Sequence, residues 1–141
     1  ISFNTIWKEW NNEKNNRSVN QNPCIEIASL LIKSVNDAHI THLVQKDRTL
    51  ARHTALEKYY DGAVEDIIDT IVEITMDLYP VDDIKVESSC AIDDPVSYFK
   101  NLYSKIESLR ESVKESFLLN QIDEVQQEIA HTLYRLNFIT T

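Results

Sequence analysis

Three of the four histidines in this 141-residue chain lie near one another in the sequence, at His39, His42 and His53, and acidic residues follow them at regular intervals. Imidazole nitrogens and carboxylate oxygens are ligands that iron, manganese and zinc take in proteins. Glu57 follows His53 by four residues, which places both side chains on the same face of a helix. This segment is therefore a candidate metal site. The alternative is a helix whose polar face simply meets water.

Hydrophobic spacing predicts the helices that would carry these residues. After Pro23, apolar residues recur every three or four positions as far as His42, so we expect a first helix of about 20 residues. The same spacing predicts one continuous second helix from Leu50 to Leu78. Pro80 would end it, because proline cannot continue the backbone hydrogen bonds of a helix.

The second half of the chain predicts two more helices. Residues 80–94 have no helical period and are expected to form a long crossover. Asp93 or Asp94 would cap the next helix, with Pro95 in its first turn. Apolar residues then recur almost to the C-terminus, and Asn120 is the expected break between the third and fourth helices, since asparagine tolerates a left-handed helix end.

Together these elements predict an all-α, ferritin-like up-down four-helix bundle with a long crossover between its second and third helices. The predicted bundle domain covers residues 24–141. Residues 1–23 would form an N-terminal arm with a short amphipathic segment that contains Ile6, Trp7 and Trp10.

Composition excludes several classes of function. Gly62 is the only glycine, so no glycine-rich phosphate loop exists. A formal net charge of -9, from 23 acidic and 14 basic residues, argues against direct binding of nucleic acid. Cys24 and Cys90 lack a metal or redox spacing and are expected to be ordinary thiols in a reducing compartment. With no signal peptide and no apolar run of the about 20 residues that span a bilayer, we expect a cytoplasmic protein without membrane association.

The stretch from Ala38 to Glu73 resembles the iron-site region of the Dps miniferritins. In that family one histidine ends the first helix, another opens the second, and a D-x-x-x-E pair follows. The positions that match the family's ligands are His42, His53, Asp69 and Glu73, with Glu57 at an additional acidic position. The chain is also similar to uncharacterised ferritin-like proteins of large tailed phages.

The resemblance implies an iron-binding, ferroxidase-type protein, with manganese or zinc as alternative metals. It also implies a homo-oligomer, at least a dimer, in which Asp69 and Glu73 meet the histidines of a second subunit. A phage-encoded protein of this kind would work in the cytoplasm of the bacterial host. Leu43 stands where the family usually has tryptophan, and no lysine-rich tail is present, so the family's DNA-protecting role is not implied.

A different class of function is compatible with the same residues. On a helix, Asp61, Glu65, Asp69 and Glu73 form an acidic stripe that drifts away from the apolar face. The chain could therefore be a non-catalytic acidic helical bundle that acts by protein-protein interaction, as a phage adaptor or one directed at a host protein with a basic surface.

Four other residues have competing interpretations. Glu128 and His131 form an E-x-x-H pair, which also occurs in di-iron bundles, but His131 is expected to point away from the core. We interpret this pair as a surface coincidence. Tyr59 and Tyr60 are expected at the core and its boundary, and the alternative is that one of them acts as an electron donor or a hydrogen-bond partner beside a metal.

Overall fold

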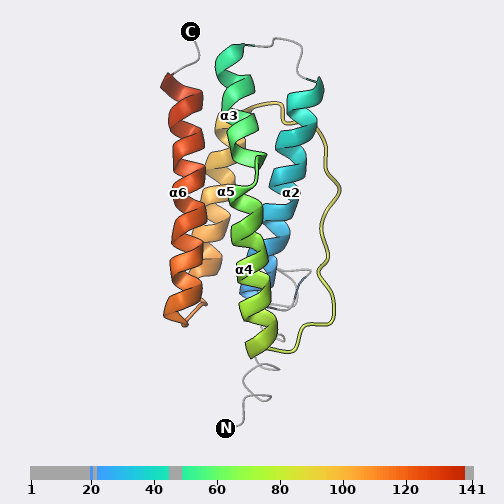
Figure 1. Ribbon diagram of the computed structural model, residues 1–141, viewed down its shortest axis with the longest axis vertical. Helices are drawn as coiled ribbons and strands as arrows, with labels where there is room; N and C mark the ends of the chain where they lie inside the picture. The colour runs from blue at the N-terminus through green and yellow to red at the C-terminus, as the bar shows by residue number, and fades with distance from the viewer. Residues whose placement is uncertain (1–19, 21, 45–48, 139–141) are drawn as a thin grey trace.

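The computed structural model describes residues 20, 22–44 and 49–138, which form helices joined by loops, with no strand in these ranges (Figure 1). The helices are α2 (Pro23–Val44), α3 (Leu50–Tyr60), α4 (Ala63–Leu78), α5 (Pro95–Arg110) and α6 (Ser116–Phe138). The prediction of an all-α protein is confirmed. The predicted segment with Ile6, Trp7 and Trp10 lies outside the described residues.

The helices form four rods, because α3 and α4 follow one another along the same side of the molecule (Figure 1). α2 and α6 run in one direction, whereas α3, α4 and α5 run in the other (Figure 1). The rods contact one another through a single core, in which the largest fully buried apolar side chains include Leu31, Leu56, Ile71, Phe99 and Ile122. Burial of each such side chain contributes roughly 1.5–3 kcal/mol to folding.

The prediction of one continuous helix from Leu50 to Leu78 was wrong. The helix is broken at Asp61 and Gly62, and Gly62 adopts a φ of 114°, which residues with a side chain rarely adopt. The apolar pattern continues across the break, since Tyr59 and Val64 are both fully buried. Hydrophobic spacing alone therefore could not reveal the break.

The predicted break at Asn120 was also misplaced, because Asn120 lies inside α6 and the connection is formed by residues 111–115. Val113 is buried there and contributes to the core from outside a helix. The hydroxyl of Tyr79, just beyond α4, donates a hydrogen bond to the Glu115 carboxylate. Tertiary contacts thus hold this turn, and they have no local sequence signature.

Residues 79–94 form the predicted crossover, which runs along the bundle beside α2 (Figure 1). Its ends are as predicted: α4 stops before Pro80, and the Asp94 side chain caps α5 by accepting a hydrogen bond from the Ser97 backbone N–H at 3.3 Å. Ser29 of α2 donates to the Lys85 carbonyl at 2.6 Å, so the middle of the crossover is held against α2.

The carboxylate of Asp37 on α2 anchors the end of the crossover. It is 1% exposed and receives hydrogen bonds from Lys33 Nζ (2.6 Å), the Tyr98 hydroxyl (2.6 Å) and the Cys90 backbone N–H (3.0 Å). Burial opposes the ionisation of Asp37, but these donors outweigh it and hold the pKa of the carboxyl below its usual value. One buried charge therefore joins α2, the crossover and α5.

We expect Asp37→Asn to lower the free energy of unfolding at pH 7 by about 2 kcal/mol, because charge-assisted hydrogen bonds become neutral ones. In the wild type, the contribution of Asp37 is fully present above its unfolded pKa of about 3.9 and is lost as the pH falls through the lower folded pKa. Urea denaturation between pH 7 and pH 3 measures both effects. Exposed Asp77→Asn is the control, and an equal loss in both variants would contradict the anchoring role.

We expect Gly62→Ala to destabilise the protein by roughly 1–3 kcal/mol, since a positive φ strains the backbone of a residue that has a side chain. An added Cβ would meet nothing within 4 Å, so steric contact does not complicate the measurement. Thermal or urea unfolding gives the value. Unchanged or increased stability would show that the helix break does not depend on glycine.

Candidate metal centre

His42, His53 and Glu57 come together where the end of α2 lies beside the start of α3. His42 is in the last turn of α2, His53 is in the first turn of α3, and Glu57 follows one turn later. The Nε2 atoms of the two histidines are 2.8 Å apart, and Glu57 Oε2 lies 3.8 Å from each. One ligand atom from each residue lies within 4.8 Å of the others, so the cluster could hold a metal ion.

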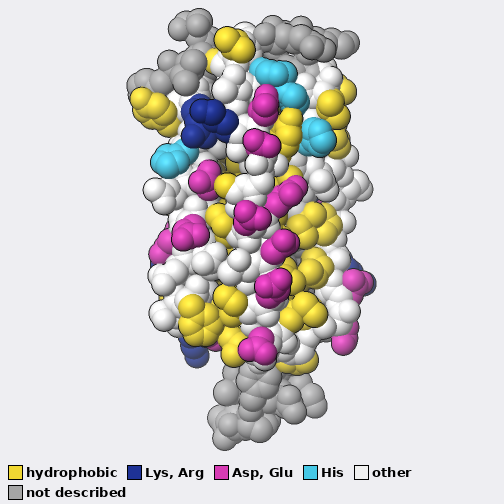
Figure 2. All heavy atoms as spheres, in the orientation of Figure 1, with side chains coloured by type: hydrophobic (Ala, Val, Ile, Leu, Met, Phe, Trp, Pro, Cys, Tyr) yellow, Lys and Arg dark blue, Asp and Glu magenta, His cyan; other side chains and the backbone are white. Residues whose placement is uncertain are grey.

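Exposure increases from one side of this cluster to the other. The side chain of His42 is 17% exposed, that of His53 is 36% exposed and that of Glu57 is 53% exposed. Figure 2 shows histidine and acidic side chains next to one another near the upper end of the molecule. The cluster is therefore anchored on its histidine side and open to solvent at the carboxylate, where an ion could enter.

Tyr60 orients His42, the less exposed of the two histidines. Its hydroxyl lies 2.7 Å from Nδ1 of His42, and its ring stacks on that of His39 with centroids 4.6 Å apart. Partial burial, followed by the carboxylates of Glu57 and Asp61, raises the pKa of Tyr60, so the phenol stays protonated at neutral pH. If Nε2 of His42 bound a metal, Nδ1 would carry the proton and its N–H would donate a hydrogen bond to the Tyr60 oxygen, which would fix the plane of the imidazole.

The donor set fits a divalent transition metal. The two Nε2 atoms, 2.8 Å apart, and Glu57 Oε2, 3.8 Å from each, would hold such an ion between them. Two imidazoles and one carboxylate with open positions are typical of non-haem Fe(II) sites. A bound ion would replace the hydrogen bond between the histidines, and solvent or further oxygen ligands would occupy the remaining positions.

Asp69 and Glu73, the other two predicted ligands, are not in this cluster. Both are exposed on α4, as helix geometry predicted, and Asp69 lines a groove between α2 and α4 with Ile32 and Val35. Within one chain, across residues 20, 22–44 and 49–138, His42, His53 and Glu57 are the one group that could hold a metal. His131 is exposed on α6, in agreement with the interpretation of its E-x-x-H pair as a surface feature.

The position of Tyr60 beside the cluster could have been predicted from its spacing to His53 and Glu57, although hydrophobic spacing did not reveal it. His53, Glu57 and Tyr60 are separated by four and three residues, which places all three on one face of α3. Tyr60 therefore contacts His42 from the same face that carries the other ligands. Tyr59 is fully buried, and its hydroxyl lies 2.7 Å from Ser34 Oγ, so it belongs to the core as expected.

The chain is thus an all-helical protein with a candidate metal centre between α2 and α3. Residues 42–136 match the family of unknown function DUF5856, and the chain belongs to that family. The matched segment contains all three clustered residues, as well as Asp69 and Glu73. No curated protein and no solved structure matches the chain. None of the helices described above is long and apolar enough to cross a membrane.

We expect Tyr60→Phe to weaken metal binding at least about tenfold, because loss of a partner that orients a ligating histidine has effects of this size. Competition between the protein and a chelator for Co(II) or Zn(II) measures the affinity. Tyr103→Phe, at an exposed position on α5, is the matched control. Equal affinities in the two variants would exclude the orienting role of Tyr60.

Proposed function

We propose that this chain is a miniferritin-like protein that binds Fe(II) as a substrate at His42, His53 and Glu57 and oxidises it. The observation that carries the proposal is the convergence of two imidazole nitrogens and a carboxylate oxygen at the α2–α3 junction. Short connections within each pair of rods and a long crossover between the pairs also suit a ferritin-like bundle. Dioxygen or hydrogen peroxide would accept the electrons.

The proposed active unit is a dimer. Three protein ligands leave coordination positions open on the solvent side of the cluster, at Glu57. Asp69 and Glu73 are exposed carboxylates one helical turn apart on α4, and their own chain does not bring them to that cluster. In a second copy packed against the α2–α3 junction, they would supply oxygen ligands for one iron or for a pair of irons bridged by a carboxylate.

The acidic surface favours a second candidate function. Asp61, Glu65, Asp69 and Glu73 are all exposed, and acidic side chains descend the face of the molecule shown in Figure 2. On a chain of net charge -9, this surface would attract a basic protein. In that case the bundle would act as a non-catalytic adaptor, and the histidine cluster would be structural or would bind zinc or manganese.

Iron retention distinguishes these functions. After metal-stripped protein is loaded with Fe(II) without oxygen and desalted, we expect at least stoichiometric iron in the wild type and strong loss in His53→Ala. Loss is expected because one of only two nitrogen ligands is removed. Elemental analysis gives the iron content, and exposed His131→Ala is the matched control. Equal iron in His53→Ala and the wild type would rule out this site.

The dimer makes a separate prediction. We expect Asp69→Asn to slow Fe(II) oxidation, measured by absorbance after exposure to air, while Asp77→Asn on the same helix leaves the rate unchanged. An unaltered oxidation rate in Asp69→Asn would show that Asp69 of a second subunit does not take part, and only the three-residue site within one chain would remain. Salt-sensitive capture of a basic protein by metal-free protein, without retained iron, would instead support the adaptor function.

A further inference from the structure

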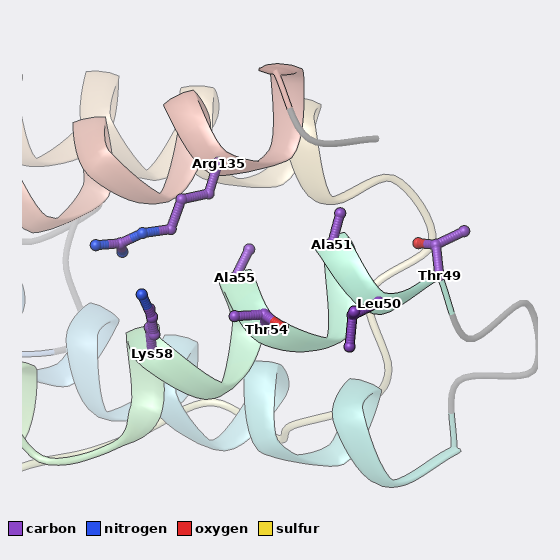
Figure 3. Close-up of a pocket in the computed structure, with 7 residues that line it drawn as sticks. All are labelled: Thr49, Leu50, Ala51, Thr54, Ala55, Lys58 and Arg135. Atoms are coloured by element: carbon purple, nitrogen blue, oxygen red, sulfur yellow. The ribbon is translucent and has the colours of Figure 1, made fainter. Parts of the chain in front are cut away.

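A cavity lies between α3 and α6 and has a volume of about 320 Å³ (Figure 3). It exists because α3 presents small side chains to α6: Ala51 and Ala55, one turn apart, point toward that helix (Figure 3). Leu50 and Thr54 form its edge. The volume is at the small end of the range for ligand sites, so it suits a small molecule.

Two cations converge at this cavity. Lys58 of α3 and Arg135 of α6 extend toward one another across the gap between the helices (Figure 3). Within the described part of the chain, neither side chain forms an ion pair or a hydrogen bond. Each lies in the last turn of its helix, where the helix dipole favours a cation. The dipoles account for the presence of each charge, but they do not account for the convergence of two like charges.

Two cations without a carboxylate partner among the described residues line this cavity although the chain as a whole is acidic. Acidic residues outnumber basic ones by 23 to 14, yet no carboxylate from the described residues pairs with Lys58 or Arg135. Two facing cations repel, and an anion between them removes that repulsion while it accepts hydrogen bonds from both. The planar guanidinium of Arg135 can bind a carboxylate through two parallel hydrogen bonds.

The apolar wall of the cavity determines which other chemical group the ligand needs. Leu50, Ala51 and Ala55 give the cavity an apolar surface, and Leu50 is 79% exposed to water. A hydrocarbon group placed there would remove apolar surface from water on both molecules. A purely polar anion would leave this surface uncovered.

We propose that the cavity binds a small organic anion, with its carboxylate between Lys58 and Arg135 and a short hydrocarbon chain against Leu50, Ala51 and Ala55. The site is independent of the proposed metal function, because neither His53 nor Glu57 lines the cavity. Thr54 adds a hydroxyl at the edge of the cavity that can donate to the carboxylate.

Saturation-transfer difference NMR with hexanoate tests this site on the intact protein and is suitable for any oligomer. We expect saturable binding that weakens about tenfold or more in Arg135→Gln and in Lys58→Gln, because each removes a charge-assisted hydrogen bond. Lys100→Gln, at an exposed position on α5, is the matched control and should bind as the wild type does. Thr54→Met, which fills the cavity and keeps both cations, should also weaken binding. Far-UV circular dichroism establishes that each variant is folded.

The probes separate the two parts of the proposal. Hexanol, which lacks the charge, and inorganic phosphate, which lacks the hydrocarbon and has no non-exchangeable protons, are compared with hexanoate by competition for the hexanoate signal. Each should displace hexanoate more weakly than hexanoate itself binds. Hexanol binding as tightly as hexanoate would overturn the role of the cations, and phosphate binding as tightly would overturn the role of the apolar wall. Absence of saturable hexanoate binding, or equal weakening in Lys100→Gln, would overturn the site.

Discussion

The short connection between two antiparallel helices determines where metal-ligating residues can meet. Only residues 45–49 separate α2 from α3, so the last turn of α2 must lie beside the first turns of α3. His42 comes from one side of this junction, and His53 and Glu57 come from the other. A shift of α3 by one residue would rotate its side chains by 100° and turn both of its ligands away from His42.

α2 is held in place at this junction because it contacts the crossover on one side and α3 on the other. Asp37 and Thr41 accept hydrogen bonds from the backbone of Cys90 and Ile92 in the crossover, whereas His42 faces α3. The crossover therefore fixes the part of α2 that immediately precedes the histidine. The buried charge of Asp37 and the exposed charge of Glu57 thus have different roles: the first holds the scaffold together, and the second can change its partner when an ion enters.

The sequence predicted those features whose causes are local. Pro80 and the Asp94–Pro95 pair define helix ends through their own backbone chemistry, and the spacing of His53 and Glu57 places them on one helical face. The break at Gly62 was missed because the apolar pattern continues through it. Val113 and the Tyr79–Glu115 contact form a turn through tertiary packing, and Lys58 and Arg135 converge from helices distant in the sequence. The partners of Asp69 and Glu73 remain a prediction, because they require a second subunit.

A helical bundle alone does not define a function, so the ligands of a bound ion provide the most direct test. X-ray absorption spectroscopy at the iron edge of Fe(II)-loaded protein measures them. We predict a shell of nitrogen and oxygen without sulfur, with multiple scattering from imidazole. An oxygen-only shell without imidazole scattering would place the iron on the acidic surface and contradict a metal centre at His42, His53 and Glu57.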